Sequence, residues 1–228
     1  MQPYLFPYIG YFQLIHAVDL FVIYDDVKYI KGGWINRNKI LVNNKEYLFT
    51  FSLKKSSSYA NINERFFSEK FKNEKLKFLK TVEHSYKRAP FFYDVYPIIQ
   101  DIMNYEKENI SEFISYSLKV VCKYLGIKTP FVFSSCIDKK DFLKGEERVI
   151  NINKCLNSTC YINHIGGVGL YSKSRSKQEG IDLYFLKPKP IHYKQFNADF
   201  IPWLSIIDVL MFNSKDTVRT FLDEYELI

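Results

Sequence analysis

The N-terminal third of the chain gathers side chains that could do chemistry. Asp25 and Asp26 follow an apolar run, and residues 31–38, KGGWINRN, add an indole, amides and a guanidinium. Open α/β sheets usually place ligand-binding groups just past the carboxyl ends of their strands. Arg37 could clamp a phosphate or carboxylate, Trp34 could stack on a sugar or base, and Asp25 could act as a base. The alternative is an exposed loop with one Arg–Asp ion pair.

Residues 2–12, QPYLFPYIGYF, form a second unusual segment with two prolines, one glycine and five aromatic residues. Pro3 and Pro7 fix their own φ angles, and Gly10 permits a close approach. A rigid aromatic loop suits a planar or sugar ligand. The same composition would also serve to hold the N-terminal segment against the core.

Histidine and cysteine offer further candidates. His84 lies in a predicted helix, and His164 follows a predicted strand that begins near Cys160. A Cys160 thiolate near His164 would suit an acyl-thioester donor, although cysteines in strands are usually core residues. Cys155, Cys160 and His164 superficially resemble a zinc site, but structural zinc sites use four ligands at tighter spacing, so we expect no metal. The glycines in 166–169 could cradle a phosphate or form a plain turn, and they match neither dinucleotide-binding nor P-loop patterns.

The residues from Gln2 to Ile40, QPYLFPYIGYFQLIHAVDLFVIYDDVKYIKGGWINRNKI, resemble the opening of the WbqC-like family, a bacterial group associated with O-antigen gene clusters. The resemblance continues at 86–92, 161–171, 195–196 and 204–210. In that family the Gln-Pro pair usually follows a short apolar strand, whereas here Met1 directly precedes Gln2. The family motif also includes Pro7 and Gly10. We expect substrate binding by Gln2, Tyr4, Tyr11, Asp26, Trp34, Asn36, Arg37, Tyr86, Lys87, Gln195, Ser205, Asp208 and Asn213, and catalysis by Asp25, His84, Cys160 or His164.

The resemblance implies a role in cell-surface polysaccharide synthesis. We expect modification of a nucleotide-linked amino sugar by N-acyl or aminoacyl transfer. Such a transferase needs a base, oxyanion donors and phosphate clamps, and these roles fit Asp25 or His84, Asn36 or Gln195, and Arg37 respectively. The expected co-substrate is an acyl-thioester of coenzyme A or of an acidic acyl carrier protein, with no tightly bound cofactor.

Two other functions stay open. Pro7 and Gly10 before a helix and strand loosely resemble the phosphate-binding opening of nucleotidyltransferases, with Tyr8 and Tyr11 where that pattern has histidines. A third reading is a non-catalytic polysaccharide-assembly module that docks an acidic acyl carrier protein on its basic surface.

Composition narrows the partners and the location. The net charge of +7 comes from 32 Lys+Arg against 25 Asp+Glu, and both signs mix at helical spacing in 70–80, which favours a solvated helix over a nucleic-acid surface. No apolar run approaches the roughly 20 residues that span a bilayer, and no secretion leader is recognisable. Four cysteines without a leader indicate reduced thiols, so we expect a cytoplasmic protein.

Periodicity predicts the elements that position these residues. We expect α/β architecture, with a mixed or mainly parallel sheet flanked by helices, in a single domain over 1–228 with a helical cap at about 65–127. The expected strands are 20–24, a hairpin of 38–42 and 46–53, 131–133, 159–163 and 181–187, and the expected helices after the first are 74–88, 93–108, 110–126, 145–157, 171–179, 203–213 and 215–226.

Overall fold

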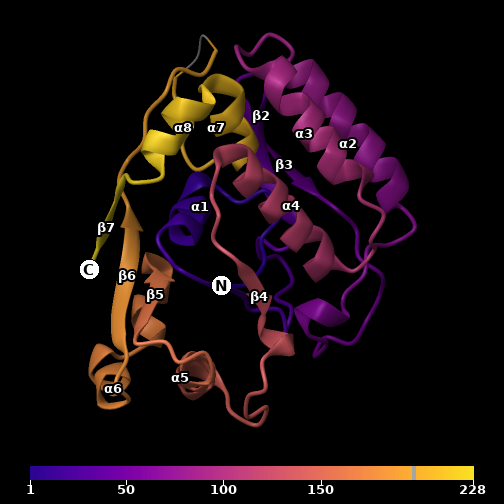
Figure 1. Ribbon diagram of the computed structural model, residues 1–228. Helices are drawn as coiled ribbons and strands as arrows, with labels where there is room; N and C mark the ends of the chain where they lie inside the picture. The colour runs from indigo at the N-terminus through magenta and orange to yellow at the C-terminus, as the bar shows by residue number, and fades with distance from the viewer. Residues whose placement is uncertain (197–198) are drawn as a thin grey trace.

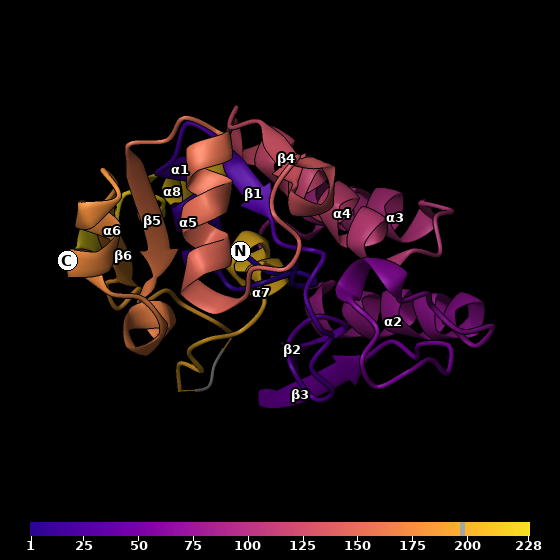
Figure 2. The same cartoon turned by 90° about the horizontal axis from the view of Figure 1, so that it is seen from below.

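The chain folds as mixed α/β, as its sequence predicts, in a computed structural model that describes residues 1–196 and 199–228. Helix α1 (Ile9–His16) leads into strand β1 (Phe21–Ile23), which pairs in parallel with β4 (Phe131–Phe133). The backbone of Met1 continues this ladder on the other side of β1, because its amine donates to Val22 O at 2.8 Å and its carbonyl accepts from Tyr24 N at 2.8 Å. Met1 therefore lies between the β1–β4 pair and β5 (Figures 1 and 2).

The predicted hairpin is confirmed, with a tighter turn than expected. Strands β2 (Arg37–Val42) and β3 (Lys45–Thr50) are antiparallel, with Val42 opposite Lys45. Asn43 and Asn44 have φ of 49° and 57°, the left-handed conformation that a two-residue turn of this type requires at both positions. Asparagine tolerates this conformation better than most residues, so the Asn-Asn pair sets the register.

Three helices follow the hairpin, and the first of them packs against β2. They follow the 3₁₀ turn η1 (Ile62–Glu64) and run as α2 (Phe71–Tyr86), α3 (Phe92–Asn104) and α4 (Ile110–Leu125), within the segment predicted as a helical cap. Gly126 ends α4 at φ 77°, the left-handed C-cap for which glycine is favoured. Figure 1 shows α2 and α3 side by side at the outer surface, with α4 nearer the centre of the molecule.

The C-terminal half contains a second small sheet. After the 3₁₀ turn η2 (Ser134–Cys136), α5 (Gly145–Cys155) leads to β5 (Cys160–His164), the 3₁₀ turn η3 (Ile165–Leu170) and α6 (Lys173–Gln178). Strand β6 (Asp182–Pro188) then pairs in parallel with β5. Helices α7 (Ile206–Phe212) and α8 (Lys215–Phe221) precede β7 (Tyr225–Leu227), which is antiparallel to β6. The prediction of helix through 226 is wrong at 225–226, because these residues belong to β7, which pairs with β6.

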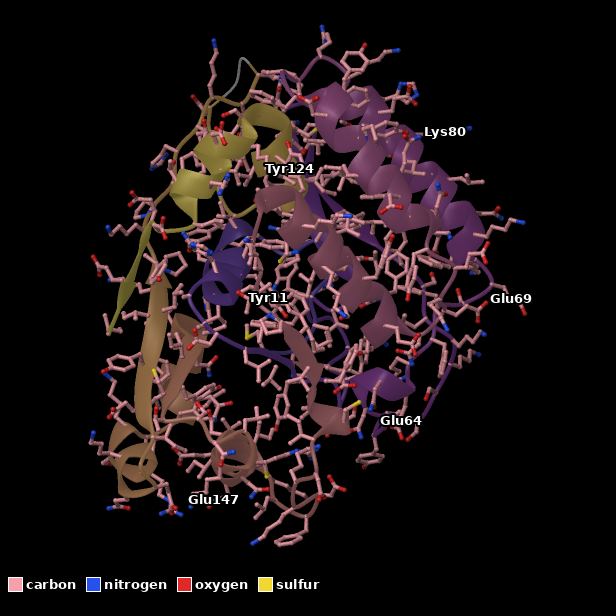
Figure 3. The ribbon with its side chains drawn as sticks, viewed as in Figure 1. Tyr11, Glu64, Glu69, Lys80, Tyr124 and Glu147 are labelled. Atoms are coloured by element: carbon pink, nitrogen blue, oxygen red, sulfur yellow. The ribbon has the colours of Figure 1, made fainter. Side chains whose placement is uncertain are left out.

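Helix α1 lies in the interior. All its residues from Ile9 to Ile15 are buried, and Tyr11, 2% exposed, occupies the centre of the molecule (Figure 3). The buried apolar side chains of α1, β1, the hairpin and α2–α4 form one continuous cluster with α7 and α8. Among the residues that the structure describes, no helix is long and apolar enough to cross a membrane.

Candidate functional site

The carboxyl ends of β1 and β4 meet through Asp25. Its carboxylate is buried and accepts three hydrogen bonds, from Ser134 Oγ at 3.2 Å, Ser135 N at 3.1 Å and Ser135 Oγ at 2.7 Å. Parallel strands bring these two ends to the same edge, which explains how residues 109 positions apart meet. With both oxygens engaged, the carboxylate fixes the β4 end against β1 and leaves little capacity to take a proton from a substrate.

Asp26, the next residue, forms a charge cluster with two cations. Its Oδ2 lies 2.5 Å from Lys139 Nζ and 2.6 Å from Arg148 Nη2, and the Lys139 side chain is only 2% exposed. Burial would raise the pKa of Asp26, but hydrogen bonds from Lys139 and Ser134 and the charge of Arg148 hold it below its usual value. The carboxylate therefore stays ionised and ties α5 to the end of β1.

A tyrosine–histidine pair lies where β5 ends and α1 begins. Tyr8 Oη contacts His164 Nε2 within hydrogen-bond distance, and His164 Nδ1 accepts from Gly166 N at 3.3 Å. Because Nδ1 is an acceptor, the proton of the neutral ring belongs on Nε2 and is donated to Tyr8 Oη. Burial lowers the pKa of His164, so the imidazole is neutral at pH 7.

Gly10 makes room for this pair. A Cβ at position 10 would lie 2.4 Å from Tyr8 Cζ and Oη, well inside van der Waals contact, so only glycine allows the phenol ring to fold back over the first turn of α1. Burial raises the pKa of Tyr8 far above its ordinary value, which keeps the phenol protonated. The sequence predicts close approach at Gly10, and the structure shows Tyr8 as the group that approaches.

A small apolar cavity adjoins Tyr8. Its volume is about 80 Å³, and the chain turns at 188–193 and 200–204 form most of its wall together with Tyr8 and Ile9. Trp203 at its rim is 67% exposed and has φ of 62°, a conformation that bulky residues rarely adopt. Its ring packs edge-on against Tyr8, with the centroids 5.7 Å apart. Backbone strain at an exposed tryptophan beside a cavity is a feature of ligand sites.

The structure brings Tyr86, Gln195 and Asp208 together, but in a buried network. Asp208 is fully buried and accepts from Tyr86 Oη at 2.8 Å, Tyr193 Oη at 2.7 Å and Gln195 Nε2 at 2.8 Å. Tyr86 in turn accepts from Leu41 N at 2.7 Å. Burial raises the pKa of Asp208, although its three hydrogen bonds act in the opposite direction. The network joins α2, β2 and α7, and its polar groups are occupied by one another.

In the loop before β2, the side chain of Asn36 is buried, whereas those of Trp34 and Arg37 lie nearer the surface. Asn36 is buried, accepting from Tyr29 Oη at 2.7 Å and donating to Phe51 O at 2.8 Å, so its amide supports the loop. Arg37 and Trp34 lie nearer the surface, with the guanidinium 5.6 Å from the indole centroid. The Arg37 side chain donates to the carbonyls of Gly32 and Gly33. The alternative of an exposed loop with an Arg–Asp ion pair is not seen for Arg37 in residues 1–196 and 199–228, because Asp26 pairs with Lys139 and Arg148 and Asp25 accepts from Ser134 and Ser135.

The remaining predicted residues are dispersed. Tyr11 Oη donates to Gln2 O at 2.8 Å and Tyr4 Oη to Gln2 Oε1 at 3.4 Å, which fixes the N-terminal segment. Ser205 caps α7, accepting from Ile207 N at 3.2 Å, and Asn213 at its other end donates back to Val209 O at 2.8 Å. Lys87 is the exposed C-cap of α2, and His84 is exposed on the same helix.

Cys160 and His164 do not form a dyad. They occupy the two ends of β5, four residues and therefore roughly 13 Å apart along the strand. Burial raises the pKa of the Cys160 thiol, which opposes thiolate formation. Cys155 lies at the end of α5, and its Sγ contacts Asp138 O at 3.3 Å. Throughout the described parts of the chain, no three His, Cys, Asp or Glu side chains are grouped to hold a metal.

The sequence analysis did not predict the partners of Asp26 or the pairing of Tyr8 with His164. Lys139 and Arg148 lie in ordinary charged segments, and only the parallel β1–β4 pairing brings them to Asp26. The position of Tyr8 between Pro7 and Gly10 indicated that it belongs to a rigid aromatic loop. Nothing in the sequence links it to His164, 156 residues away.

Comparisons with known proteins identify a family and one distant relative. The sequence model of the WbqC-like protein family matches residues 2–220. The uncharacterized protein Rv1507c of Mycobacterium tuberculosis is 28% identical over 213 residues, which cover 92% of this chain and 90% of that relative. No solved structure matches significantly.

Proposed function

The chain belongs to the WbqC-like protein family, and from this premise we propose that it transfers an acyl or aminoacyl group to the amine of a nucleotide-linked sugar for cell-surface polysaccharide. The expected donor is an acyl-thioester, of coenzyme A or of an acyl carrier protein.

One observation carries the proposal, the contact of Tyr8 Oη with His164 Nε2 at the start of α1. In the tautomer that Gly166 favours, the imidazole donates to the phenol oxygen, so the phenol hydrogen is free to donate elsewhere. A donor polarised in this way suits the oxyanion that develops on a thioester carbonyl. Neither Asn36 nor Gln195, the donors expected from the sequence, supports this role as well, because their amides already donate to Phe51 O and to the Asp208 carboxylate.

The reaction follows from these groups. The sugar amine attacks the thioester carbonyl carbon, a C–N bond forms, and the carbonyl oxygen takes the negative charge while it accepts from Tyr8 Oη. The C–S bond then breaks, and the proton lost by the nitrogen goes to the departing thiolate. His164 does not need to change its charge, which agrees with its lowered pKa.

The cavity beside Tyr8 supports a small acyl group. A cavity of about 150 Å³ can hold benzene, so about 80 Å³ corresponds to roughly two to four carbon atoms. Its walls are mainly apolar, which favours the acyl chain over the sugar or the nucleotide. We therefore assign the cavity to the acyl portion of the donor.

Product analysis tests the proposal. Purified protein is incubated with UDP- or dTDP-linked amino sugars and acetyl-coenzyme A, and mass spectrometry records whether the sugar gains an acetyl group. We expect Tyr8→Phe to reduce the rate about 10²- to 10³-fold, the usual effect of losing one oxyanion donor. The control is Tyr93→Phe, at an exposed tyrosine on α3. A full rate in Tyr8→Phe would refute the assignment.

A nucleotidyltransferase is the second candidate, because α1 begins without a side-chain N-cap and without an acidic residue in its first turn. Free amides at a helix N-terminus favour phosphate. Incubation with ATP or CTP and Mg²⁺ decides between the two, since a nucleotidyltransferase releases pyrophosphate and an acyltransferase does not.

A further inference from the structure

Arg65 is a buried cation without an anionic partner. It is 7% exposed, its Nη2 donates to Ser57 O at 2.7 Å, and its buried Nε has no hydrogen-bond acceptor. No carboxylate lies within 4 Å of its guanidinium in the described residues, and the neighbouring Glu64 instead accepts from Asn61 N at 2.7 Å. A buried charge is costly unless it is paired, so an unpaired one indicates an absent anion.

A second arginine without a carboxylate partner, Arg37, directly follows Asn36, whose Oδ1 accepts from Tyr29 Oη at 2.7 Å. The Arg65 guanidinium lies over the Tyr29 ring at 4.8 Å from its centroid. Burial raises the pKa of Tyr29, and the positive charges of Arg65 and Arg37 both oppose that rise. Arg37 binds only backbone carbonyls of its own loop. Two guanidinium groups about one tyrosine, neither paired with a carboxylate, form a centre suited to an oxyanion.

Exposed aromatic rings surround this centre. Trp34, 43% exposed, lies under Arg37, and Tyr59, 78% exposed, lies under Lys28 Nζ at 4.8 Å from its centroid. Cations alternating with exposed rings match a ligand that has both phosphates and a planar base. A simple inorganic anion would use the cations but not the rings.

We infer that Arg37, Arg65 and Tyr29 bind the diphosphate of a nucleoside diphosphate, with Trp34 or Tyr59 against its base. This inference rests on the proposed function in that the nucleoside diphosphate is the carrier of the sugar, and it adds the residues that hold the carrier. The sequence did not indicate Arg65, Tyr29 or Tyr59 as site residues.

The diphosphate centre is joined to the Tyr8–His164 pair through one side chain. Asn38, next to Arg37, donates to Leu5 O at 3.0 Å and Phe6 O at 2.8 Å, two residues before Tyr8. Phe6 has φ of 43°, and this bond helps to hold the conformation. The two centres therefore share one rigid support, as binding of one extended substrate requires.

Calorimetric titration with UDP, uridine and inorganic pyrophosphate tests the inference without any acyl donor. We expect UDP to bind at least roughly tenfold more tightly than uridine, because charged hydrogen bonds supply the difference. Arg37→Gln should weaken UDP binding roughly 10- to 100-fold, and Arg65→Lys should do so as well because lysine keeps the charge but lacks the planar fork. Arg175→Gln is the matched control, since Arg175 is on α6, on the opposite side of the molecule from β2 and β3 (Figures 1 and 2).

The results separate this inference from the proposed function. Arginine-dependent UDP binding without acyl transfer would support the diphosphate centre and overturn the acyltransferase. Acyl transfer with UDP affinity unchanged in Arg37→Gln would overturn the diphosphate centre alone, as would equal affinity for UDP and uridine. If Arg65→Lys fails to fold, Arg37→Gln still decides, because its side chain lies nearer the surface.

Discussion

Replacement of Gly10 by alanine separates the role of the Tyr8–His164 pair from that of the fold. The new Cβ would lie 2.4 Å from Tyr8 Cζ and Oη, and an ordinary contact needs about 3.5 Å. The phenol must therefore move by about 1 Å, which lengthens and weakens its hydrogen bond to His164. The cost to stability is small because the clash involves the end of a side chain, and alanine is better than glycine in a helix by about 1 kcal/mol. Loss of the hydrogen bond costs about 1 kcal/mol, so the two effects nearly cancel.

Two measurements follow. The midpoint of thermal unfolding should change by less than about 4 °C, since 1 kcal/mol shifts a chain of this size by about 2–4 °C. The pKa of His164, followed by NMR of the imidazole, should rise toward 6.5 because the burial that lowers it is relieved. Wild-type stability should fall as the pH drops below 6.5, where the unfolded chain binds a proton that the folded chain does not, and Gly10→Ala should lose less.

Gly126→Ala is the matched control for Gly10→Ala. Gly126 has φ of 77°, so alanine there is strained and should destabilise by about 1–2 kcal/mol without changing the pKa of His164. A large loss of stability in Gly10→Ala with an unchanged His164 pKa would show that Gly10 serves packing and that the phenol position does not depend on it. Acyl transfer should fall in Gly10→Ala about as far as in Tyr8→Phe.

Two further predictions concern the buried polar clusters. Asp26→Ala should destabilise by about 3–5 kcal/mol in urea unfolding, because it leaves the buried Lys139 with only the exposed Asp141 carboxylate, 3.9 Å from its Nζ. Since the pKa of Asp26 is lowered in the folded state, its contribution is present above the unfolded pKa of 3.8 and is lost as the pH falls through the folded value, so wild type and variant should converge in acid. Asp208→Ala should destabilise by a similar amount, with three buried donors left unpaired, and equal stability would show that water replaces the carboxylate.

Local sequence predicted the elements well and the contacts between them poorly. The Asn43–Asn44 turn and the Gly126 cap follow from backbone preferences that act within a few residues. The error at 225–227 has the opposite cause, because β7 exists through its pairing with β6, about 40 residues earlier. The apolar runs that reveal the equally short strands β1 and β4 are absent from Tyr225–Leu227, which contains Glu226.

For the candidate site too, the sequence indicated individual residues but not the contacts between them. Asp208 and Gln195 received a binding assignment from the family resemblance, yet both are buried and their side chains bind each other. Cys160 and His164 are close in sequence, but an extended strand separates them. Arg37 stays a candidate in the structure, and the inferred diphosphate site adds Arg65, which no spacing in the sequence could indicate.

By itself the sequence determined the α/β class, the family, and the position of a polar-aromatic loop around Arg37, since each depends on residue order and local preference. Tertiary structure alone decided that Tyr8 meets His164, that Asp26 is neutralised by Lys139 and Arg148, and that Arg65 is buried without an anion. The physical reason is that charge pairing and burial depend on distance in space, which parallel strand pairing sets between segments more than 100 residues apart.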